Sequence, residues 1–382
     1  MRRPPAATDN DIRGVQPAGL PVARVWDLPL RIFHWSLVVA VAFMLVSGWL
    51  LPPVFVNFHV WVGSAIAVLI VGRLIWGFLG TRTSRFSNFP PSLSRGIGEL
   101  RERLAGHPAE PCSGHNPAGA LMVYALLATL MVLVVSGFMA WGGKEKSGPL
   151  AAFLSFDVGS LANQLHSLVG FLLAGLIAAH LIGVIVASRA ERQNLVHVMV
   201  TGRKRVAKLV EPATARPLLA TVILAGFIVA GSALWLRGAA LPALGAAVAA
   251  VPATYNSACG ECHMAFPPQL LPRASWQKVL ASLADHFGED ASIPAADAAA
   301  VIAYLDGHAS EGSDLKAAHY FGVADATEPR RITAMDHWHR IPDDLPAAAF
   351  KAKAVGSKAN CAACHHDAES GRFTRAEIAV PE

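Results

Sequence analysis

The chain has 382 residues, of which 53% are hydrophobic and 15% are charged, and its mean hydropathy is +0.42. This composition excludes an ordinary soluble protein and indicates membrane spans joined to a more polar part. The net charge of +5 is no sign of nucleic-acid binding, because the basic residues follow the distribution of a multi-span membrane protein.

Five apolar runs reach the length of about 20 residues that a bilayer span requires. We expect spans at about 32–51, 58–79, 119–141, 162–187 and 216–236. The first run is too long for the apolar part of a signal peptide and follows about thirty residues that include prolines and acids, so we expect it to stay in the mature protein. The first and third runs both end in Ser-Gly-aromatic, at residues 47–49 and 136–138.

The basic residues predict the orientation of these spans, since cytoplasmic segments are rich in Lys and Arg. Basic residues gather in the N-terminal arm, between spans two and three and between spans four and five, whereas 52–57 has none and 142–161 has two. The N-terminus is therefore expected in the cytoplasm and the part after span five outside. The residues concerned are Arg2, Arg3, Arg13, Arg24, Arg31, Arg82, Arg85, Arg95, Arg101, Arg103, Arg189, Arg192, Arg203, Lys204, Arg205, Lys208 and Arg216, against Lys144 and Lys146.

Four histidines lie in the spans, where an ionisable side chain is costly and marks a function by default. His166 and His180 are fourteen residues apart in span four, which is about 21 Å and close to a whole number of helical turns. They therefore share one face, near opposite sides of the bilayer. The directions of the spans then pair His34 with His180 on the cytoplasmic side and His59 with His166 on the outer side.

Two interpretations of these histidines stay open. A single buried histidine is usually a hydrogen-bonding residue between helices, but four at matching depths suit two stacked haems with two histidine ligands each. Gly48, Gly63, Gly137 and Gly170 would let a porphyrin approach the backbone, although membrane helices also use small residues for ordinary packing. Arg73, toward the inner end of span two, either holds a propionate of the inner haem or extends to the interface.

Four of the five cysteines form two CxxCH motifs, "CGECH" and "CAACH". Two thiols at this spacing can join the two vinyl groups of one haem, and the histidine that follows can reach the iron, so each motif predicts covalent c-type haem attachment. A Cys₄ zinc site usually has about 15–20 residues between its pairs, whereas 98 separate these, and disulfides would not explain the two histidines. The residues are Cys259, Cys262, His263, Cys361, Cys364 and His365.

Each of these haems needs a second axial ligand. We expect His286, at the end of a predicted amphipathic helix in "SWQKVLASLADHFG", and His339, in "DHWHRIP", to fill these roles. Which haem each serves stays open. The alternatives are His308, His319, His337, His366, Met335 and Met264, the last of which points away from the iron because it directly follows His263.

The first 210 or so residues resemble the bacterial cytochrome b561 family and the b-type cytochrome subunits of nickel–iron hydrogenases. The matching pieces are "VWDLPLRIFHW", "HVWVG", "GRLIWG" and "HSLVGFLLAGLIAAH". Residues 250–382 resemble the dihaem cytochrome c family in "CGECHMAFPPQLLPRASW", "LADHFGEDA", "VIAYL", "HRIP" and "ANCAACHHDAESGRFTRAEIAVP". The first resemblance implies a four-helix core with two b haems, whose ligand positions match His34, His59, His166 and His180.

The two resemblances together imply an all-α protein with a membrane helical bundle and a mostly helical periplasmic dihaem cytochrome c domain. We expect a membrane domain at 1–213, a fifth transmembrane helix and linker at 214–250 and the c-type domain at 251–382. The fifth span departs from the four-helix core and is interpreted as the connector. The implied cofactors are two non-covalent haem b and two covalent haem c, in a multi-pass protein of the bacterial inner membrane.

The expected function is transmembrane electron transfer from membrane quinol to a periplasmic c-type haem protein, with the protein setting potentials and holding the haems close together. Such a protein would be an electron-transfer cytochrome, with a quinol:cytochrome c type oxidoreductase as the candidate enzyme class. One alternative is a cytochrome subunit of a larger enzyme such as a hydrogenase, which would receive electrons from a protein. A haem sensor is a third, but the histidines suffice to fill every axial position.

Overall fold

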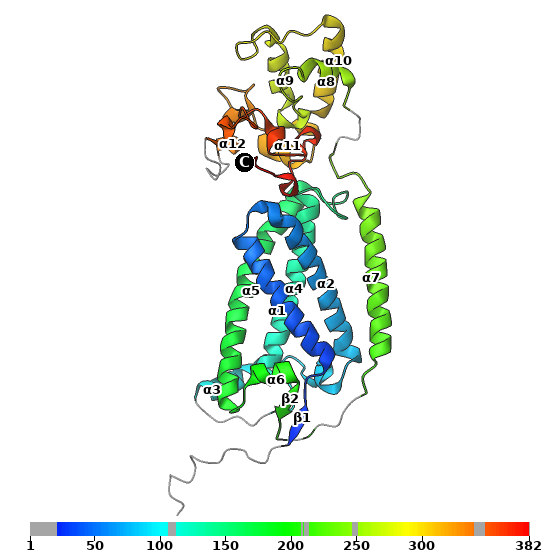
Figure 1. Ribbon diagram of the computed structural model, residues 1–382, viewed down its shortest axis with the longest axis vertical. Coiled ribbons are helices and arrows are strands. Elements are labelled where there is room, and N and C mark those ends of the chain that lie inside the picture. The colour runs from blue at the N-terminus through cyan, green and yellow to red at the C-terminus, as the bar shows by residue number, and fades with distance from the viewer. Residues whose placement is uncertain are drawn as a thin grey trace, which may run out of the picture. The chain divides into compact units, whose positions relative to one another are not determined.

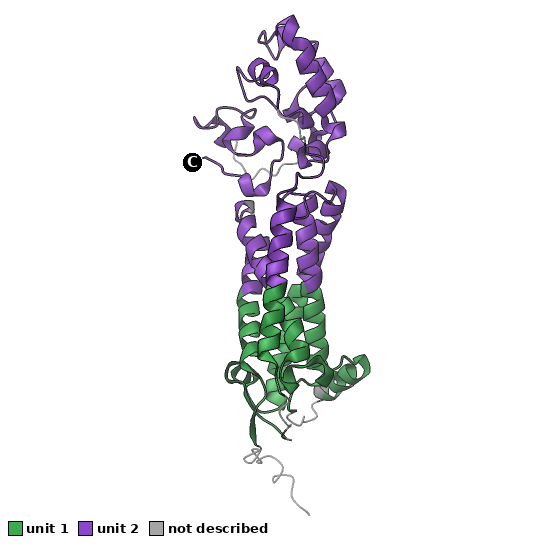
Figure 2. Ribbon diagram, turned by 90° about the vertical axis from the view of Figure 1, so that its right-hand side faces the viewer, with its two compact units in different colours: residues 1–39, 68–130, 172–226 green, residues 40–67, 131–171, 227–382 purple. Residues whose placement is uncertain are grey.

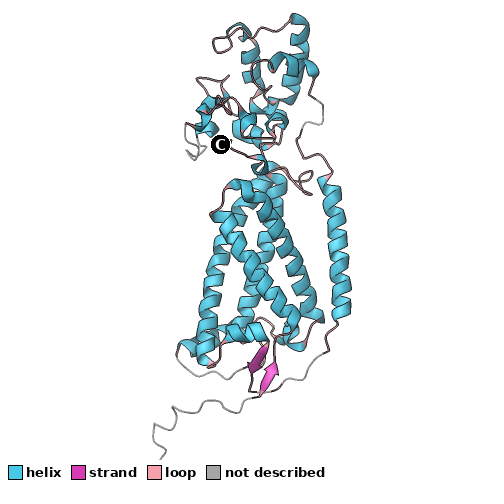
Figure 3. Cartoon of the chain, viewed as in Figure 1, coloured by secondary structure: helices cyan, strands magenta, loops and turns pink. Residues whose placement is uncertain are grey.

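The computed structural model describes residues 21–105, 112–207, 209, 214–246, 251–339 and 348–381, and helices account for most of the regular structure (Figures 1 and 3). The mainly helical fold expected from the sequence is confirmed. Arg2, Arg3, Arg13 and Lys208, which contributed to the predicted orientation, lie outside the described residues.

Within the described residues, five helices are long and apolar enough to cross a membrane. They are apolar around most of their circumference, as helices surrounded by lipid are, and each matches one of the five predicted runs. α5 begins six residues before its predicted start. The helices are α1 (Leu28–Trp49), α2 (Val56–Leu79), α4 (Pro117–Gly143), α5 (Phe156–Ala190) and α7 (Pro217–Ala239).

The remaining elements of the N-terminal 210 residues are short. Among the described residues they are the helices α3 (Leu93–Leu104) and α6 (Leu195–Thr201), 3₁₀ turns at Pro53–Phe55, Arg82–Ser84 and Phe86–Asn88, and two strands, β1 (Val22–Arg24) and β2 (Arg203–Arg205), which pair antiparallel. α6 has local signals at both ends: the Asn194 side chain accepts a hydrogen bond from the His197 N–H, and Gly202 ends the helix at a φ of +78°. The two strands were not predicted.

Helices and turns also make up residues 251–339 and 348–381, called the C-terminal segment below. Its helices are α8 (Ala253–Cys259), α9 (Arg273–Leu280), α10 (Ala295–His308), α11 (Lys316–Phe321) and α12 (Asp336–His339). Their shared core includes Tyr255, Trp276, Val301 and Leu305, and Cys259 packs against it. The first CxxCH motif thus begins at the end of a helix that is anchored in this core.

The chain divides into two compact units (Figure 2). The first unit comprises residues 1–39, 68–130 and 172–226, and the second comprises 40–67, 131–171 and 227–382. The helices α1, α2, α4, α5 and α7 contribute residues to both. In the first unit, the Arg216 N–H donates to the Leu79 carbonyl, which ties α7 to the end of α2. In the second, Trp235 of α7 packs on Trp141 of α4 at 5.4 Å between ring centroids.

Candidate functional site

His59 of α2 and His166 of α5 approach each other in the second unit. Their ring centroids are 6.1 Å apart and the ring planes are inclined by 70°. An imidazole nitrogen ligates a metal at about 2 Å, so two imidazoles on opposite sides of one metal ion place their centroids about 6 Å apart. The spacing of the two rings therefore fits a haem iron between them.

The Nδ1 atoms of both rings have partners on the neighbouring helices. His59 Nδ1 lies 2.8 Å from Ser47 Oγ, and His166 Nδ1 lies 3.0 Å from the Leu133 carbonyl and 3.3 Å from Ser136 Oγ. A ligating histidine typically donates its remote N–H to such an acceptor, which fixes the tautomer and the ring orientation. The bonds at Nδ1 leave Nε2 as the nitrogen that can face a metal.

Gly137 allows α4 to come close to the His166 ring. A Cβ atom at this position would lie 3.0 Å from His166 Cε1, closer than carbon atoms normally pack, whereas at Gly48 it would lie 3.5 Å from His59 Cε1, an ordinary contact. A Cβ at Gly63 would instead meet Met44 at 3.4 Å, and one at Gly170 would meet Trp49 at 4.0 Å. Of the four glycines considered above, Gly137 is the one at which a larger residue would most require the neighbouring side chain to shift.

His34 of α1 and His180 of α5 belong to the first unit. The two side chains are near enough to interact electrostatically. His34 Nδ1 is buried and has no hydrogen-bond partner among the described residues. A buried imidazole nitrogen without a partner can instead interact with a bound group, either as a metal ligand or through a hydrogen bond to an acceptor of that group. The structure therefore brings together the same two pairs that the sequence predicts.

Arg73 of α2 is buried, with 3% of its surface exposed, and its place at a haem propionate stays a prediction. Its guanidinium lies over the Phe86 ring, 4.6 Å from the centroid, and NH1 has no hydrogen-bond partner in the described part of the chain. The nearby Asp27 carboxylate accepts instead from Trp76 Nε1 at 2.9 Å and Thr81 Oγ1 at 2.6 Å. A buried guanidinium with a free N–H fits a carboxylate such as a haem propionate.

A second group that the sequence did not predict, the imidazole of His115, lies near Arg73. Its ring contacts Trp26 at 4.7 Å and Phe89 at 4.2 Å between centroids. Burial, together with Arg73 and Lys204, lowers the pKa of His115 to about 3, so it is neutral at neutral pH. Its Nδ1 is buried without a partner among the described residues. It lies in a loop before α4, where no span or motif drew attention to it.

The first CxxCH motif places His263 opposite His286. Their ring centroids are 6.3 Å apart, a spacing again close to that of two imidazoles on one metal. His263 Nδ1 lies 2.7 Å from the Met264 carbonyl, which leaves Nε2 to face a metal. The helix predicted to carry His286 ends at Leu280; His286 follows a short 3₁₀ turn instead, and its backbone N–H donates to the Glu289 carbonyl at 2.8 Å.

The second CxxCH motif lies in a 3₁₀ turn at Cys361–Ala363. Burial raises the pKa of the Cys361 thiol to about 11. His365 Nδ1 is buried without a hydrogen-bond partner in the described part of the chain, and its ring contacts Phe373 at 5.3 Å. His339 is exposed at the end of α12. Its pairing with His365 stays a prediction.

Two further observations concern the alternatives to these assignments. Met335, a possible thioether ligand, is 1% exposed and belongs to the hydrophobic core of the C-terminal segment. All five cysteines, each within the described residues, are free thiols, so the two CxxCH pairs are not disulfides. Free thiols are what covalent attachment to haem requires.

Comparison with known proteins matches two separate parts of the chain to two families. Residues 25–202 match the family described as prokaryotic cytochrome b561, and residues 255–373 match the family described as dihaem cytochrome c. The two matched ranges contain the four membrane histidines and both CxxCH motifs, respectively.

Individual relatives match one or the other part. The probable Ni/Fe-hydrogenase B-type cytochrome subunit of Bradyrhizobium diazoefficiens is 25% identical over 234 residues, which is 52% of this chain and 93% of that protein. The corresponding hydrogenase 1 subunit of Escherichia coli K12 is 26% identical over 152 residues, 34% of this chain and 64% of its own length. A crystal structure of DHC from Rhodobacter sphaeroides is 31% identical, covering 33% of this chain and 100% of that one, with a TM-score of 0.26.

Proposed function

We propose, from the premise that the chain joins a domain of the prokaryotic cytochrome b561 family to one of the dihaem cytochrome c family, that it carries electrons across a bacterial inner membrane from quinol to a periplasmic acceptor. The chain is a haem-containing electron-transfer protein of the membrane. The proposal adds the donor, the acceptor, the direction and the number of haems. It divides the chain into a membrane domain at 1–213, a connector at 214–250 and a periplasmic domain at 251–382.

The proposed cofactors are two haem b and two haem c. We assign His34 with His180 and His59 with His166 to the b-type sites, and His263 with His286 and His365 with His339 to the c-type sites. Cys259, Cys262, Cys361 and Cys364 form the thioether bonds, and Arg73 holds a propionate. The observation that carries the assignment is the spacing of two histidine pairs, 6.1 Å for His59–His166 and 6.3 Å for His263–His286.

The bound haems supply one-electron carriers, and the chain's own residues set their surroundings. The acceptors at Nδ1, Ser47 for His59 and the Leu133 carbonyl for His166, hold the rings and raise the basicity of Nε2. Apolar helices exclude water from the b-type sites, and the buried Arg73 offers a fixed positive charge. No bond of a substrate is cut at these sites, so the protein's contribution is the potential and the position of each site.

The proposed orientation places the N-terminus in the cytoplasm and the CxxCH motifs in the periplasm. Its support is the excess of Lys and Arg in two of the segments that join spans, from Arg82 to Arg103 and from Arg189 to Arg216. Five helices within the described residues are long and apolar enough to cross a membrane, and five crossings would put the two ends on opposite sides. A periplasmic C-terminal segment can deliver electrons to a soluble haem protein, which we propose as the acceptor.

The test is anaerobic stopped-flow mixing of the detergent-purified protein with a reduced short-chain quinol, with the α-bands of haem b and haem c recorded separately. We expect the b band to be reduced first and the c band to follow. His34→Ala and His59→Ala should each block reduction of the c band. If dithionite reduces both bands but the quinol reduces neither, the quinol donor is wrong.

A second candidate function is that of a cytochrome subunit in a larger oxidoreductase. It is favoured by the names of two relatives, both probable B-type cytochrome subunits of Ni/Fe-hydrogenases. In that case electrons would come from a protein partner. Mild detergent extraction from the native membrane followed by mass spectrometry distinguishes the two, because a subunit would purify with a catalytic partner in a fixed ratio.

A further inference from the structure

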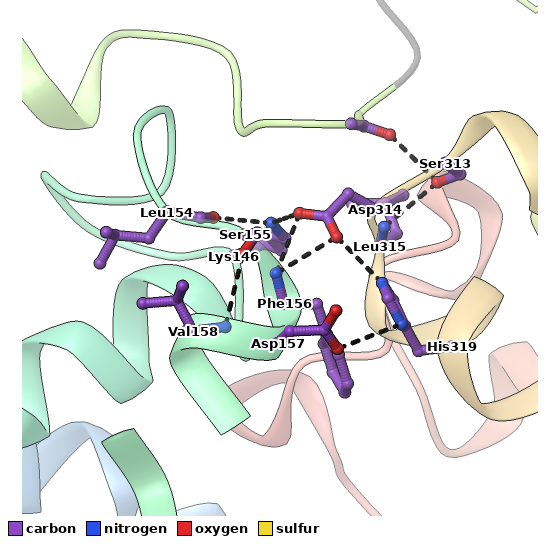
Figure 4. Close-up of polar contacts among 11 residues, drawn as sticks. Lys146, Leu154, Ser155, Phe156, Asp157, Val158, Ser313, Asp314, Leu315 and His319 are labelled. Carbon is purple, nitrogen blue, oxygen red and sulfur yellow. Dashed lines mark hydrogen bonds and ion pairs between the residues drawn. The ribbon is translucent and has the colours of Figure 1, made fainter. Parts of the chain in front are cut away.

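A single carboxylate of the C-terminal segment binds the loop between α4 and α5, residues 144–155, called the α4–α5 loop below (Figure 4). Asp314 accepts hydrogen bonds from Lys146 Nζ at 2.5 Å and from the Phe156 N–H, the first of α5, at 3.0 Å. His319 Nε2 adds a third bond at 2.9 Å. Lys146 is 1% exposed, so Asp314 both neutralises a buried charge and caps the start of α5.

A second group of contacts joins the same loop to the end of the chain. Glu145 binds Lys316 Nζ at 2.9 Å and accepts from the Arg375 N–H at 3.2 Å. Arg372 donates to the Lys146 carbonyl. The Glu145 and Lys316 side chains are only 12% and 13% exposed, and such shielded pairs are weakened little by salt. The C-terminal segment is therefore docked on the α4–α5 loop through oriented charges.

The docked residues 372–377 belong to the surroundings of the second CxxCH motif. Both the Thr374 N–H and its hydroxyl donate to Asp367 at 2.8 Å. The Ala379 N–H donates to the Cys364 carbonyl at 2.8 Å. The backbone of the turn Arg375–Glu377 also lies beside the backbone of Pro53–Phe55, which ends four residues before His59. The second motif is thus attached directly to the loops that precede His59 and His166.

The first CxxCH motif has a different environment, made by the C-terminal segment itself. His263 contacts Phe266 and His286. Cys259 packs against the hydrophobic core of that segment. Next to His286, Phe287 is 47% exposed and two arginines, Arg330 and Arg331, lie over its ring. This side of the segment is open to solvent at an aromatic and basic patch.

We infer that the second c-type site, at Cys361, Cys364 and His365, receives electrons from the His59–His166 site, and that the first c-type site, at His263 and His286, passes them to the acceptor. This order rests on the proposed function. In each transfer the donor site is oxidised by one electron and the next site is reduced by one, with no bond or proton involved. Electron transfer needs sites that are held close together, and the docking provides that for the second site.

The order is tested by removing one c-type site at a time from the full-length protein. Cys361→Ser/Cys364→Ser removes the second attachment, and Cys259→Ser/Cys262→Ser removes the first. Each protein is mixed anaerobically with duroquinol. We expect the b band to be reduced at the wild-type rate in both variants. The c band should be reduced at the wild-type rate in the 259/262 variant. In the 361/364 variant, reduction of the c band should be slower by about a hundredfold or more.

The outcomes separate this inference from the proposed function. Rapid reduction of the first c-type site in the 361/364 variant would overturn the order while leaving the function intact. If duroquinol does not reduce the b band of the wild-type protein, quinol is not the donor, and the proposed function is contradicted instead. The order is then tested on the same two variants with a photogenerated reductant.

The docking itself has a test that needs no turnover and no loss of haem. A zero-length carbodiimide should join Glu145 to Lys316, and peptide mass spectrometry should find the cross-link. Lys146→Met and Asp314→Asn should lower the cross-link yield and slow transfer from the b to the c band about tenfold or more, whereas the exposed Lys278→Met should change neither. If Asp314→Asn abolished the cross-link but left the rate of b-to-c electron transfer unchanged, the inference would also be overturned.

Discussion

Ser47 and Ser136 hold equivalent places beside His59 and His166. Each hydroxyl donates to a carbonyl of its own helix, at 3.2 Å for Ser47 and 2.7 Å for Ser136. The oxygen of each is then free to accept the N–H of the histidine ring. A hydrogen-bonded N–H makes the opposite nitrogen a more basic ligand, which favours the oxidised metal. The Ser-Gly-aromatic sequence that ends both helices thus has a physical role at the proposed site.

Removing these hydroxyls should raise the potential of the b-type site between His59 and His166. A hydrogen bond contributes about 0.5–1.5 kcal/mol, which for one electron is a shift of about 20–60 mV. Ser47→Ala should give the larger change, because His166 keeps the Leu133 carbonyl when Ser136 is lost. The measurement is a redox titration of the b α-band. Ser64→Ala is the matched control, because the Ser64 hydroxyl bonds the Val60 carbonyl of its own helix. Equal potentials in Ser47→Ala and Ser64→Ala would contradict the role of the Ser47 hydroxyl.

Arg73 should set the potential of the other b-type site. A buried positive charge near an iron disfavours its oxidised, more positive state, so Arg73→Gln should lower that potential by some tens of millivolts. The exposed Arg82→Gln should leave it unchanged. The same redox titration gives the answer, with haem content measured to show that the site remains filled. A potential unaffected by Arg73→Gln would remove the guanidinium from the site.

At the scale of elements, α5 illustrates how a distant residue determines where a helix begins. The apolar run predicts a start near residue 162, but the helix extends back to Phe156, whose N–H is bonded by Asp314. An acidic side chain at a helix N-terminus satisfies free N–H groups and interacts favourably with the helix dipole. The residue that does so lies 158 positions away, beyond the reach of any local pattern.

The docking of the C-terminal segment on the α4–α5 loop should persist at neutral pH and be lost only in acid. Burial alone would raise the pKa values of Glu145 and Asp314, but their partners hold both below the ordinary range. A carboxyl with a lowered pKa contributes stability that is complete above its ordinary pKa, about 4, and is lost as the pH falls through the lower value. The facing groups are Lys144, Lys316 and Arg375 at Glu145, and Lys146, His319 and the Phe156 N–H at Asp314.

Stopped-flow records of b-to-c transfer across pH check this expectation. The rate should be constant from pH 8 to about 5 and fall below about 4. Glu145→Gln should remove part of the acid sensitivity, since one of the two titrating carboxyls is gone. A decrease already between pH 7 and 6 would contradict the assignment to carboxylates.

The sequence predicts well what depends on long, uniform patterns. All five long helices follow from apolar runs because a span is specified by length and hydropathy alone. The histidine pairs follow because α5 is one regular helix, so a separation of fourteen residues places His166 and His180 on one face. The CxxCH motif is recognised from the sequence alone, because covalent attachment of a haem requires these residues at this spacing.

The features that could not be predicted from the sequence depend on short elements and on contacts between distant residues. Three-residue strands such as β1 and β2 have too few positions to show an alternating pattern. The helix before His286 ends earlier than its apolar period suggests, because a 3₁₀ turn follows Leu280. His115 is buried by Trp26 and Phe89, residues 26 or more positions away. Such burial by distant aromatic rings gives no local signal in the sequence.

At the scale of the whole molecule, the two membrane histidine pairs fall in different compact units. His34 and His180 belong to the first, and His59 and His166 to the second. The first unit also contains Arg73, and the second contains Ser47, whose Oγ lies 2.8 Å from His59 Nδ1. Loss of one pair should therefore leave the other site able to bind its cofactor, which makes the haem content of single variants informative.

The protein should bind two haem b and two haem c per chain, as measured by the pyridine haemochrome spectrum against protein concentration. His34→Ala or His59→Ala should each reduce haem b from two to about one and leave haem c at two, whereas the exposed His197→Ala should change nothing. Where a variant retains its haem, loss of one axial ligand opens a coordination position. Carbon monoxide should then bind to the reduced variant but not to the wild type, because in the proposed assignment two histidines would fill each iron. Binding of carbon monoxide by the wild-type b sites would instead support a sensor.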